Sequence, residues 1–76
     1  MFSDPRQWTI DQVHQWIGCQ CHEFNVPQPN LSYFNYCGAD LCNLKEEYFR
    51  YYAPDAYSTL MYRLEIWKSG KSRPKL

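Results

Sequence analysis

Residues 7–17 constrain the fold of this chain more than any other stretch. Thr9 is suited to be a helix N-cap, and Gln12 stands where a capping box places its reciprocal partner. Trp8 and Val13 flank the cap at the spacing of a hydrophobic staple, which fixes the angle at which the chain enters the helix. These residues predict an α-helix whose start and orientation are both set locally.

An apolar stripe continues from this cap along a helix that we expect to cover residues 10–22. Four apolar residues recur at helical intervals: Ile10, Val13, Ile17 and Phe24. Trp16 lies beside the stripe and widens it. A small domain would be built around such a surface.

Four further segments have helical patterns, three of them short. The short ones are 31–36, for which Asn30 is the expected cap, 39–44 and 45–52. The longer last one begins near Pro54 and ends before Gly70, a natural C′ residue. Before them, residues 1–7 form a lead-in in which Pro5 favours extended backbone, and 25–30 form a connector. The pattern predicts an all-α fold, a five-helix bundle with two longer helices bracketing three short ones.

The chain has 76 residues, which allows one domain with a single core. Aromatic residues make up 18% of it, and large rings supply much buried area per position. The predicted core residues are Trp8, Val13, Trp16, Ile17, Phe24, Phe34, Leu41, Leu44, Phe49, Leu60, Leu64 and Trp67. Gly38 is expected where the backbone turns or closely approaches another helix.

The charges are distributed unevenly although the formal net charge is zero. Lys68, Lys71, Arg73 and Lys75 lie in the last nine residues, which leaves the rest of the chain acidic and a poor docking surface for nucleic-acid phosphates. We interpret residues 70–76 as a basic flexible tail, a solvated linker, in preference to a phosphate contact. No apolar run reaches the length of a membrane span, and no signal-peptide pattern opens the chain, which favours an intracellular protein.

The cysteines and histidines do not form a convincing metal or catalytic pattern. Cys19 and Cys21, two apart on a helix, point in different directions and could not share one tetrahedral ion. We therefore expect reduced thiols, no metal and no cofactor. His14 and His22 have no partner visible in the sequence that would tune them for catalysis, so we expect no enzyme activity.

The residues and their order resemble the Pointed domain, the ETS-family branch of the sterile-alpha-motif (SAM) fold. The resemblance spans most of the chain, and its end, residues 64–69, is most similar to the prostate-derived ETS factor subgroup. The residues that carry it are Asp4-Pro5, Trp8-Thr9, Gln12-Val13, Trp16-Ile17, Glu23-Phe24, Gly38, Leu41-Cys42, Leu44 and Phe49.

The resemblance implies a protein-interaction module, spanning residues 8–69, of a sequence-specific transcription factor in the nucleus. Its partners would be a coactivator, a corepressor or a kinase, and DNA would be read by an ETS domain outside this chain. Some SAM relatives read RNA through a basic patch, which the acidic body here lacks. This leaves nucleic-acid binding by the domain itself as a remote alternative.

Self-association is the second alternative that the resemblance raises. In polymerising relatives a mid-loop surface meets the end-helix surface of the next copy, and such a heterologous contact can grow into filaments. The mid-loop side corresponds here to Tyr36, Asp40, Glu46 and Glu47, and the end-helix side to residues 53–57, which include Asp55. Neither side shows an exposed aliphatic plug in the sequence, so we expect a monomer.

The tyrosines are the most specific local clue to a binding surface. If Phe49 points inward, Tyr48 and Tyr51 point mostly outward, with Tyr52 near the boundary and Tyr33 and Tyr36 as possible neighbours. Tyrosine is enriched at interface hot spots. The competing interpretation, slightly favoured by the sequence, is that these rings cover a small core and extend their hydroxyls to water.

Overall fold

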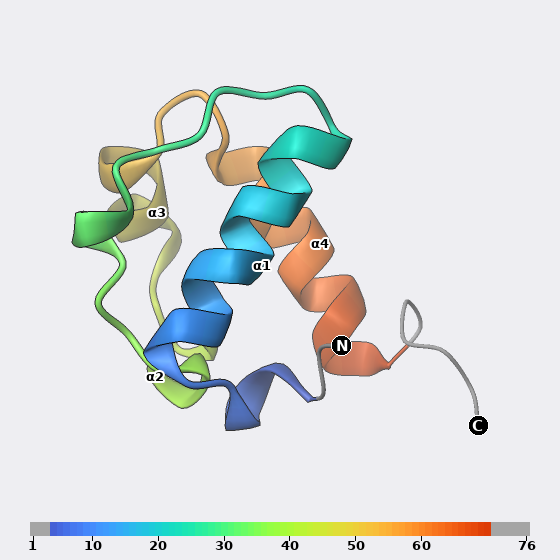
Figure 1. Ribbon diagram of the computed structural model, residues 1–76. Helices are drawn as coiled ribbons and strands as arrows, with labels where there is room; N and C mark the ends of the chain where they lie inside the picture. Colours follow the sequence, from blue (N-terminus) through green and yellow to red (C-terminus); the bar gives the residue numbers. More distant parts are fainter. Residues whose placement is uncertain (1–3, 71–76) are drawn as a thin grey trace.

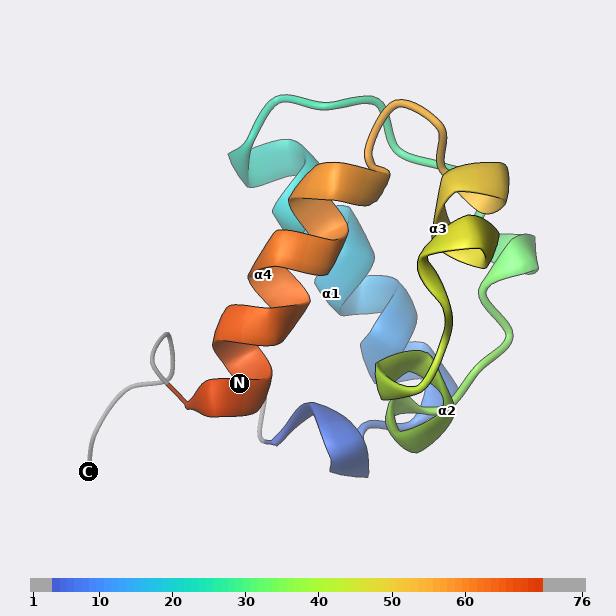
Figure 2. The same cartoon turned by 180° about the vertical axis from the view of Figure 1, so that it is seen from behind.

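Two long helices cross each other, and most of the short elements lie together on one side of them (Figures 1 and 2). The computed structural model describes residues 4–70. The elements in chain order are η1 (3-10 helix, Pro5–Gln7), α1 (Ile10–Glu23), η2 (3-10 helix, Leu31–Tyr33), α2 (Gly38–Cys42), α3 (Glu46–Tyr52) and α4 (Tyr57–Ser69). The predicted all-α class is confirmed, since these residues contain no strand. The predicted number of five helices is not confirmed. Residues 4–70 contain four α-helices and two 3-10 turns, because the segment expected over 31–36 forms only one 3-10 turn.

The predicted cap begins α1. The Gln12 backbone N–H donates to Thr9 Oγ1 (3.2 Å), and the Thr9 N–H donates to Gln12 Oε1 (2.9 Å). Both halves of the capping box are therefore formed, and an N-cap of this kind contributes about 0.5–2 kcal/mol. Trp8 and Val13, on either side of the cap, are both buried, as a hydrophobic staple requires.

The end of α1 is set by backbone geometry that the sequence analysis did not predict. Asn25 has a positive φ of 55°, which asparagine tolerates better than most residues. The Val26 N–H donates to Cys21 C=O (3.0 Å) and the Asn25 N–H to His22 C=O (3.3 Å). This is the Schellman arrangement, which satisfies the last helical carbonyls and turns the chain away from the helix axis.

Nine of the twelve predicted core residues are buried, and Leu44 and Trp67 are partly buried against them. The Trp8 ring packs against two other indoles, with centroid distances of 5.3 Å to Trp16 and 5.9 Å to Trp67. The buried hydrophobic set also includes Cys21, Ala53 and Ala56, which were not predicted.

Phe24 was wrongly predicted as a core residue, because it is 42% exposed; Ile10, the other end of the predicted stripe, is 41% exposed. The stripe assumed helical periodicity as far as residue 24, but α1 ends at Glu23 and Phe24 is its C-cap. The Phe24 ring instead lies under the Arg63 guanidinium, 5.1 Å from the ring centroid. Arg63 Nε also donates to the buried Gln20 Oε1 (3.1 Å), so this cation–π contact ties α1 to α4.

The lead-in is not extended at Pro5 as predicted. Asp4 caps the 3-10 turn η1 through its side chain, and Pro5 occupies the first position of the turn, where its missing N–H costs nothing. η1 packs against α2 and α4. Gly38 makes the packing on α2 possible, since a Cβ at this position would lie 1.7 Å from Pro5 O, and its N–H donates to Trp8 C=O (2.8 Å).

The last helix starts three residues later than predicted. Pro54 and Asp55 lie in the turn before α4, whose N-cap is Ala56 with no side-chain hydrogen bond. The predicted end is confirmed, because Gly70 terminates α4 with φ 81°. The rest of the predicted tail, residues 71–76, lies outside the described residues.

Candidate protein-interaction site

Six aromatic rings gather where η2 meets α3, with Tyr52 at the centre. Tyr52, in the last turn of α3, is partly buried, and five other rings lie around it. The centroid distances from Tyr52 are 5.5 Å to Tyr33, 5.6 Å to Phe34, 6.4 Å to Tyr36, 6.3 Å to Tyr48 and 5.8 Å to Tyr51. The five tyrosines of this cluster, Tyr33, Tyr36, Tyr48, Tyr51 and Tyr52, are called the tyrosine face below.

Phe34 anchors the η2 side of this cluster to the core. Asn30 caps η2 by accepting the Ser32 N–H at Oδ1 (3.0 Å), as predicted. Phe34 follows the turn, is fully buried, and packs 6.0 Å from the buried Phe49 of α3. Its carbonyl oxygen lies 3.0 Å from Nε2 of His14 on α1, which gives that histidine a structural partner. The tyrosine face therefore rests on fixed backbone at η2.

Tyr52 links the two sides of the face. Its ring stacks on Tyr33 with an interplanar angle of 19°, and its hydroxyl lies 3.1 Å from that of Tyr36. The hydrogen bond to Tyr36, and secondarily burial, raises the pKa of the Tyr52 hydroxyl. The contact between the two hydroxyls and the stacking on Tyr33 restrain the Tyr52 ring, so this part of the face is preorganised.

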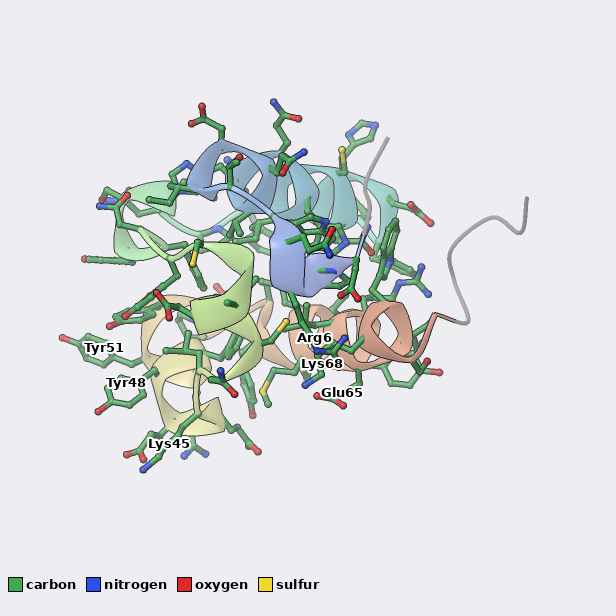
Figure 3. The ribbon with its side chains drawn as sticks, turned by 90° about the horizontal axis from the view of Figure 1, so that it is seen from below. Arg6, Lys45, Tyr48, Tyr51, Glu65 and Lys68 are labelled. Atoms are coloured by element: carbon green, nitrogen blue, oxygen red, sulfur yellow. The ribbon has the colours of Figure 1, made fainter. Side chains whose placement is uncertain are left out.

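The outer rings of the face are open to solvent. Tyr33 is 51% exposed, Tyr48 47% and Tyr51 79%, whereas Phe49 between the last two is buried. Figure 3 shows Tyr48 and Tyr51 pointing away from α3 on the same side of the molecule. Helical spacing predicted these outward directions, and it predicted Tyr52 near the boundary, where its ring is partly buried.

Tyr52 was not among the predicted site residues, although it lies at the centre of the cluster. A usable signal was present, because Tyr48 and Tyr52 are four residues apart and such residues are neighbours on a helix. Its contacts with Tyr33 and Tyr36 join separate segments, and no spacing in the sequence indicates them.

The predicted acidic site residues are all exposed, but they are not all beside the tyrosines. Glu46 and Glu47 lie in the first turn of α3, on the helix that carries Tyr48 and Tyr51. Asp40 is on α2, where its Oδ2 lies 3.6 Å from Cys37 Sγ, and Asp55 is in the turn before α4. None of these four carboxylates forms an ion pair with another described residue.

The predicted end-helix side, residues 53–57, has little surface to offer. Ala53 and Ala56 are buried in the core, with 2% and 1% exposure. The exposed residues there are Pro54 and Asp55. The predicted pair of self-association surfaces therefore exposes acids on both sides.

The cysteines are free thiols with no oxidative or metal partner among residues 4–70. Burial raises the pKa of the Cys21 thiol. Burial also raises the pKa of the Cys42 thiol, against the opposing effect of the Lys68 and Arg6 charges. Both groups are thus poor nucleophiles at neutral pH, because the thiolate is the reactive form.

No helix within the described part of the chain is long and apolar enough to cross a membrane.

Comparison with known proteins places this arrangement in a family. The profile of the sterile alpha motif (SAM)/Pointed domain matches residues 1–71. The human SAM pointed domain-containing Ets transcription factor is 31% identical over 68 residues, which are 90% of this chain and 20% of that protein. The Drosophila melanogaster DNA-binding protein D-ETS-4 is 39% identical over 67 residues, 86% of this chain and 13% of that protein. Mouse Protein C-ets-1 is 35% identical over 72 residues, 93% of this chain and 16% of that protein. The chain thus spans about a fifth or less of the length of these relatives.

Proposed function

The chain belongs to the sterile alpha motif (SAM)/Pointed domain family, and on that premise we propose that it is a non-enzymatic protein-interaction domain of a sequence-specific ETS transcription factor. The proposal extends to the prostate-derived ETS factor subgroup, which residues 64–69 indicate. DNA would be bound by an ETS domain outside this chain, and the whole protein would act in the nucleus. The relatives carry names of transcription factors and of a DNA-binding protein, which supports this assignment.

The observation that carries the proposal is the tyrosine face. Its exposed rings pack on Tyr52, which in turn packs on the buried Phe34, so part of the aromatic area that they offer is already held in place. Ordered aromatic side chains bind with a small loss of conformational entropy and are enriched among interface hot spots. A coactivator, a corepressor or a kinase that docks on this domain would contact Tyr33, Tyr48 and Tyr51.

We propose that the domain is a monomer. A mid-loop to end-helix contact would bring Asp40, Glu46 and Glu47 of one copy toward Asp55 of the next. Like charges that face each other across an interface disfavour association. Sedimentation at rising protein concentration is expected to give one monomeric species, and growth beyond a dimer would contradict this part of the proposal.

Affinity capture with matched tyrosine variants tests the interaction role. The bait is the domain, as wild type, as the double variant Tyr48→Ala/Tyr51→Ala, and as Tyr62→Ala. The last variant removes from α4 a ring whose exposure (67%) lies between those of Tyr48 and Tyr51. Quantitative mass spectrometry of nuclear extract is expected to find proteins captured by wild type and by Tyr62→Ala but lost from the double variant. If the double variant captures the same proteins while remaining folded, the tyrosine face is not the contact.

A further inference from the structure

We propose that the tyrosine face binds an arginine-containing basic segment of a partner protein, with Glu47 and Tyr51 as its principal contacts. The proposal rests on the interaction role above and specifies the chemistry of the partner. It is carried by three features of α3 and its surroundings: open aromatic surfaces, carboxylates without ion pairs beside them, and an excess of negative charge.

The aromatic component is the pair of rings at the outer edge of the face. Tyr51 is the most exposed large hydrophobic side chain of the described residues, and its ring meets Tyr52 edge-to-face at 66°. Tyr48 is inclined by 31° to Tyr52. An arginine guanidinium stacks on such ring surfaces through cation–π attraction, and its weak hydration makes this easier for arginine than for lysine.

The acidic component lies on the same helix at the correct spacing. Glu47 precedes Tyr51 by four residues, so the two side chains share one side of α3. The Glu47 carboxylate is exposed and pairs with no described cation. A carboxylate accepts two parallel N–H bonds from a guanidinium, and the adjacent ring can then cover the flat surface of that group.

The net negative charge of the segments around the face favours a basic partner over an acidic or a neutral one. Between Leu31 and Tyr57 the chain carries four exposed acids, Asp40, Glu46, Glu47 and Asp55, against two bases, Lys45 and Arg50. Glu46 and Glu47 lie on the tyrosine-bearing helix α3, whereas Asp40 and Asp55 lie on neighbouring segments. Complementary charge speeds association and selects against like-charged partners. An acidic segment is therefore disfavoured, and a neutral proline-rich segment would leave the carboxylates unused. Two bases oppose a basic ligand locally: Lys45, at the start of α3 near Tyr48 (Figure 3), and Arg50, which directly precedes Tyr51 on α3.

The same combination already occurs within the fold, at Arg63. Its guanidinium lies 5.1 Å from the Phe24 centroid, and its Nε donates to the Gln20 side-chain oxygen (3.1 Å). There an aromatic ring and one side-chain oxygen hold an arginine between α1 and α4. The pair Tyr51 and Glu47 offers the corresponding groups to solvent, with a full negative charge in place of an amide.

Titration of the isotope-labelled chain with four synthetic nine-residue peptides, followed by NMR chemical shifts, tests the proposal. Three of the peptides have a Gly-Ser framework with three arginines, three lysines or three glutamates, and the fourth is proline-rich without charge. The arginine peptide is expected to shift resonances of α3 and η2 in a saturable, salt-sensitive manner. It should bind roughly threefold or more tightly than the lysine peptide, and the glutamate peptide should not bind.

Matched variants locate the contacts. Glu47→Gln and Tyr51→Ala should each weaken the arginine peptide by roughly threefold to tenfold, while Tyr51→Phe should keep most of the affinity because the ring surface remains. Lys45→Gln should strengthen binding, since it removes a like charge. Glu23→Gln and Tyr62→Ala, which change the same residue types away from the face, should have no effect.

The outcomes separate this proposal from the broader one. Binding of the proline-rich peptide in preference to the arginine peptide, shifts confined to other surfaces, or indifference to both Glu47→Gln and Tyr51→Ala would overturn it. If the nuclear capture still depended on Tyr48 and Tyr51 in that case, the interaction role would stand with a partner of different chemistry. If capture and peptide binding were both unaffected by the tyrosine variants, both proposals would fail.

Discussion

Tryptophan and tyrosine rings gather in two separate regions of this domain, one buried in the core and one open to solvent. Trp8 and Trp16 are almost fully buried and pack with Trp67 between α1, η1 and α4. Tyr48 and Tyr51 on α3 keep about half or more of their surface in water. Aromatic residues in one small chain thus serve both the core and the surface. The tyrosine hydroxyl is what allows the second use, because it can remain hydrated while one side of the ring packs.

The comparison predicts a large loss of stability for truncation of a tryptophan and almost none for truncation of an outer tyrosine. Trp16→Ala should have the largest effect. The Trp16 side chain is completely buried, and its loss leaves a cavity beside Trp8. Such a change costs about 3–5 kcal/mol, most of the stability expected of a small domain. Urea unfolding followed by circular dichroism measures it. A loss below about 1 kcal/mol would show that this region is not the core of the fold.

Gly38→Ala tests the close backbone contact between α2 and η1 beside the tryptophan region. The new Cβ would lie 1.7 Å from Pro5 O and 2.8 Å from Trp8 N, so η1 must move away from α2. We expect a loss of roughly 1–3 kcal/mol in unfolding free energy, the range for overpacking.

Gly18→Ala is the matched control for that substitution. Its Cβ would meet only the flexible end of Gln28, at 3.4 Å, in the middle of α1. It should stabilise the domain by up to about 1 kcal/mol, because alanine is the better helix residue. Equal effects of the two substitutions would remove the special role assigned to the contact between η1 and α2.

The dependence of stability on pH tests the hydrogen bond between Tyr52 and Tyr36 in the tyrosine face. Because the pKa of Tyr52 is raised in the folded chain, the folded state keeps a proton that the unfolded state loses, so stability falls as pH rises above about 10. Tyr52→Phe should be less stable than wild type at neutral pH, since it loses the hydroxyl contact with Tyr36. The difference should narrow as pH rises through the folded pKa. Thermal unfolding of both proteins from pH 7 to 11 checks this, with Tyr62→Phe as control, and a constant difference would contradict it.

Local signals in the sequence predicted much of the fold. The cap at Thr9, the turn at Asn30 and the stop at Gly70 each depend on residues within a few positions, and all three are formed. Asp4-Pro5 carried a similar signal for η1, a capping side chain followed by proline, which was interpreted as extended chain. Phe24 was wrongly assigned to the core because the helix period was continued to residue 24, whereas α1 ends at Glu23 and Asn25 has a left-handed backbone.

Contacts between distant segments could not be predicted in the same way. The sequence marked Gly38 as a close approach but not Pro5 as its neighbour, since the contact joins residues 33 positions apart only after α1 has folded. Likewise, helical geometry gave the outward directions of Tyr48 and Tyr51. The stacking of Tyr33 on Tyr52 depends on how η2 is held by Phe34 and His14. Directions on one helix follow from spacing, whereas neighbours across elements follow from packing.

Tyr51→Ala should have the smallest effect on stability and so separates the two aromatic regions most clearly. Its side chain is 79% exposed and touches the cluster only through the edge of Tyr52. A change at such a position is expected to alter the unfolding free energy by no more than about 0.5 kcal/mol. Capture of nuclear partners and affinity for the arginine peptide should nevertheless fall. A loss of 2 kcal/mol or more would be on the scale of a buried side chain (about 2–5 kcal/mol). It would mean that Tyr51 stabilises the fold as the buried tryptophans do. The distinction between a core region and a binding region would then disappear.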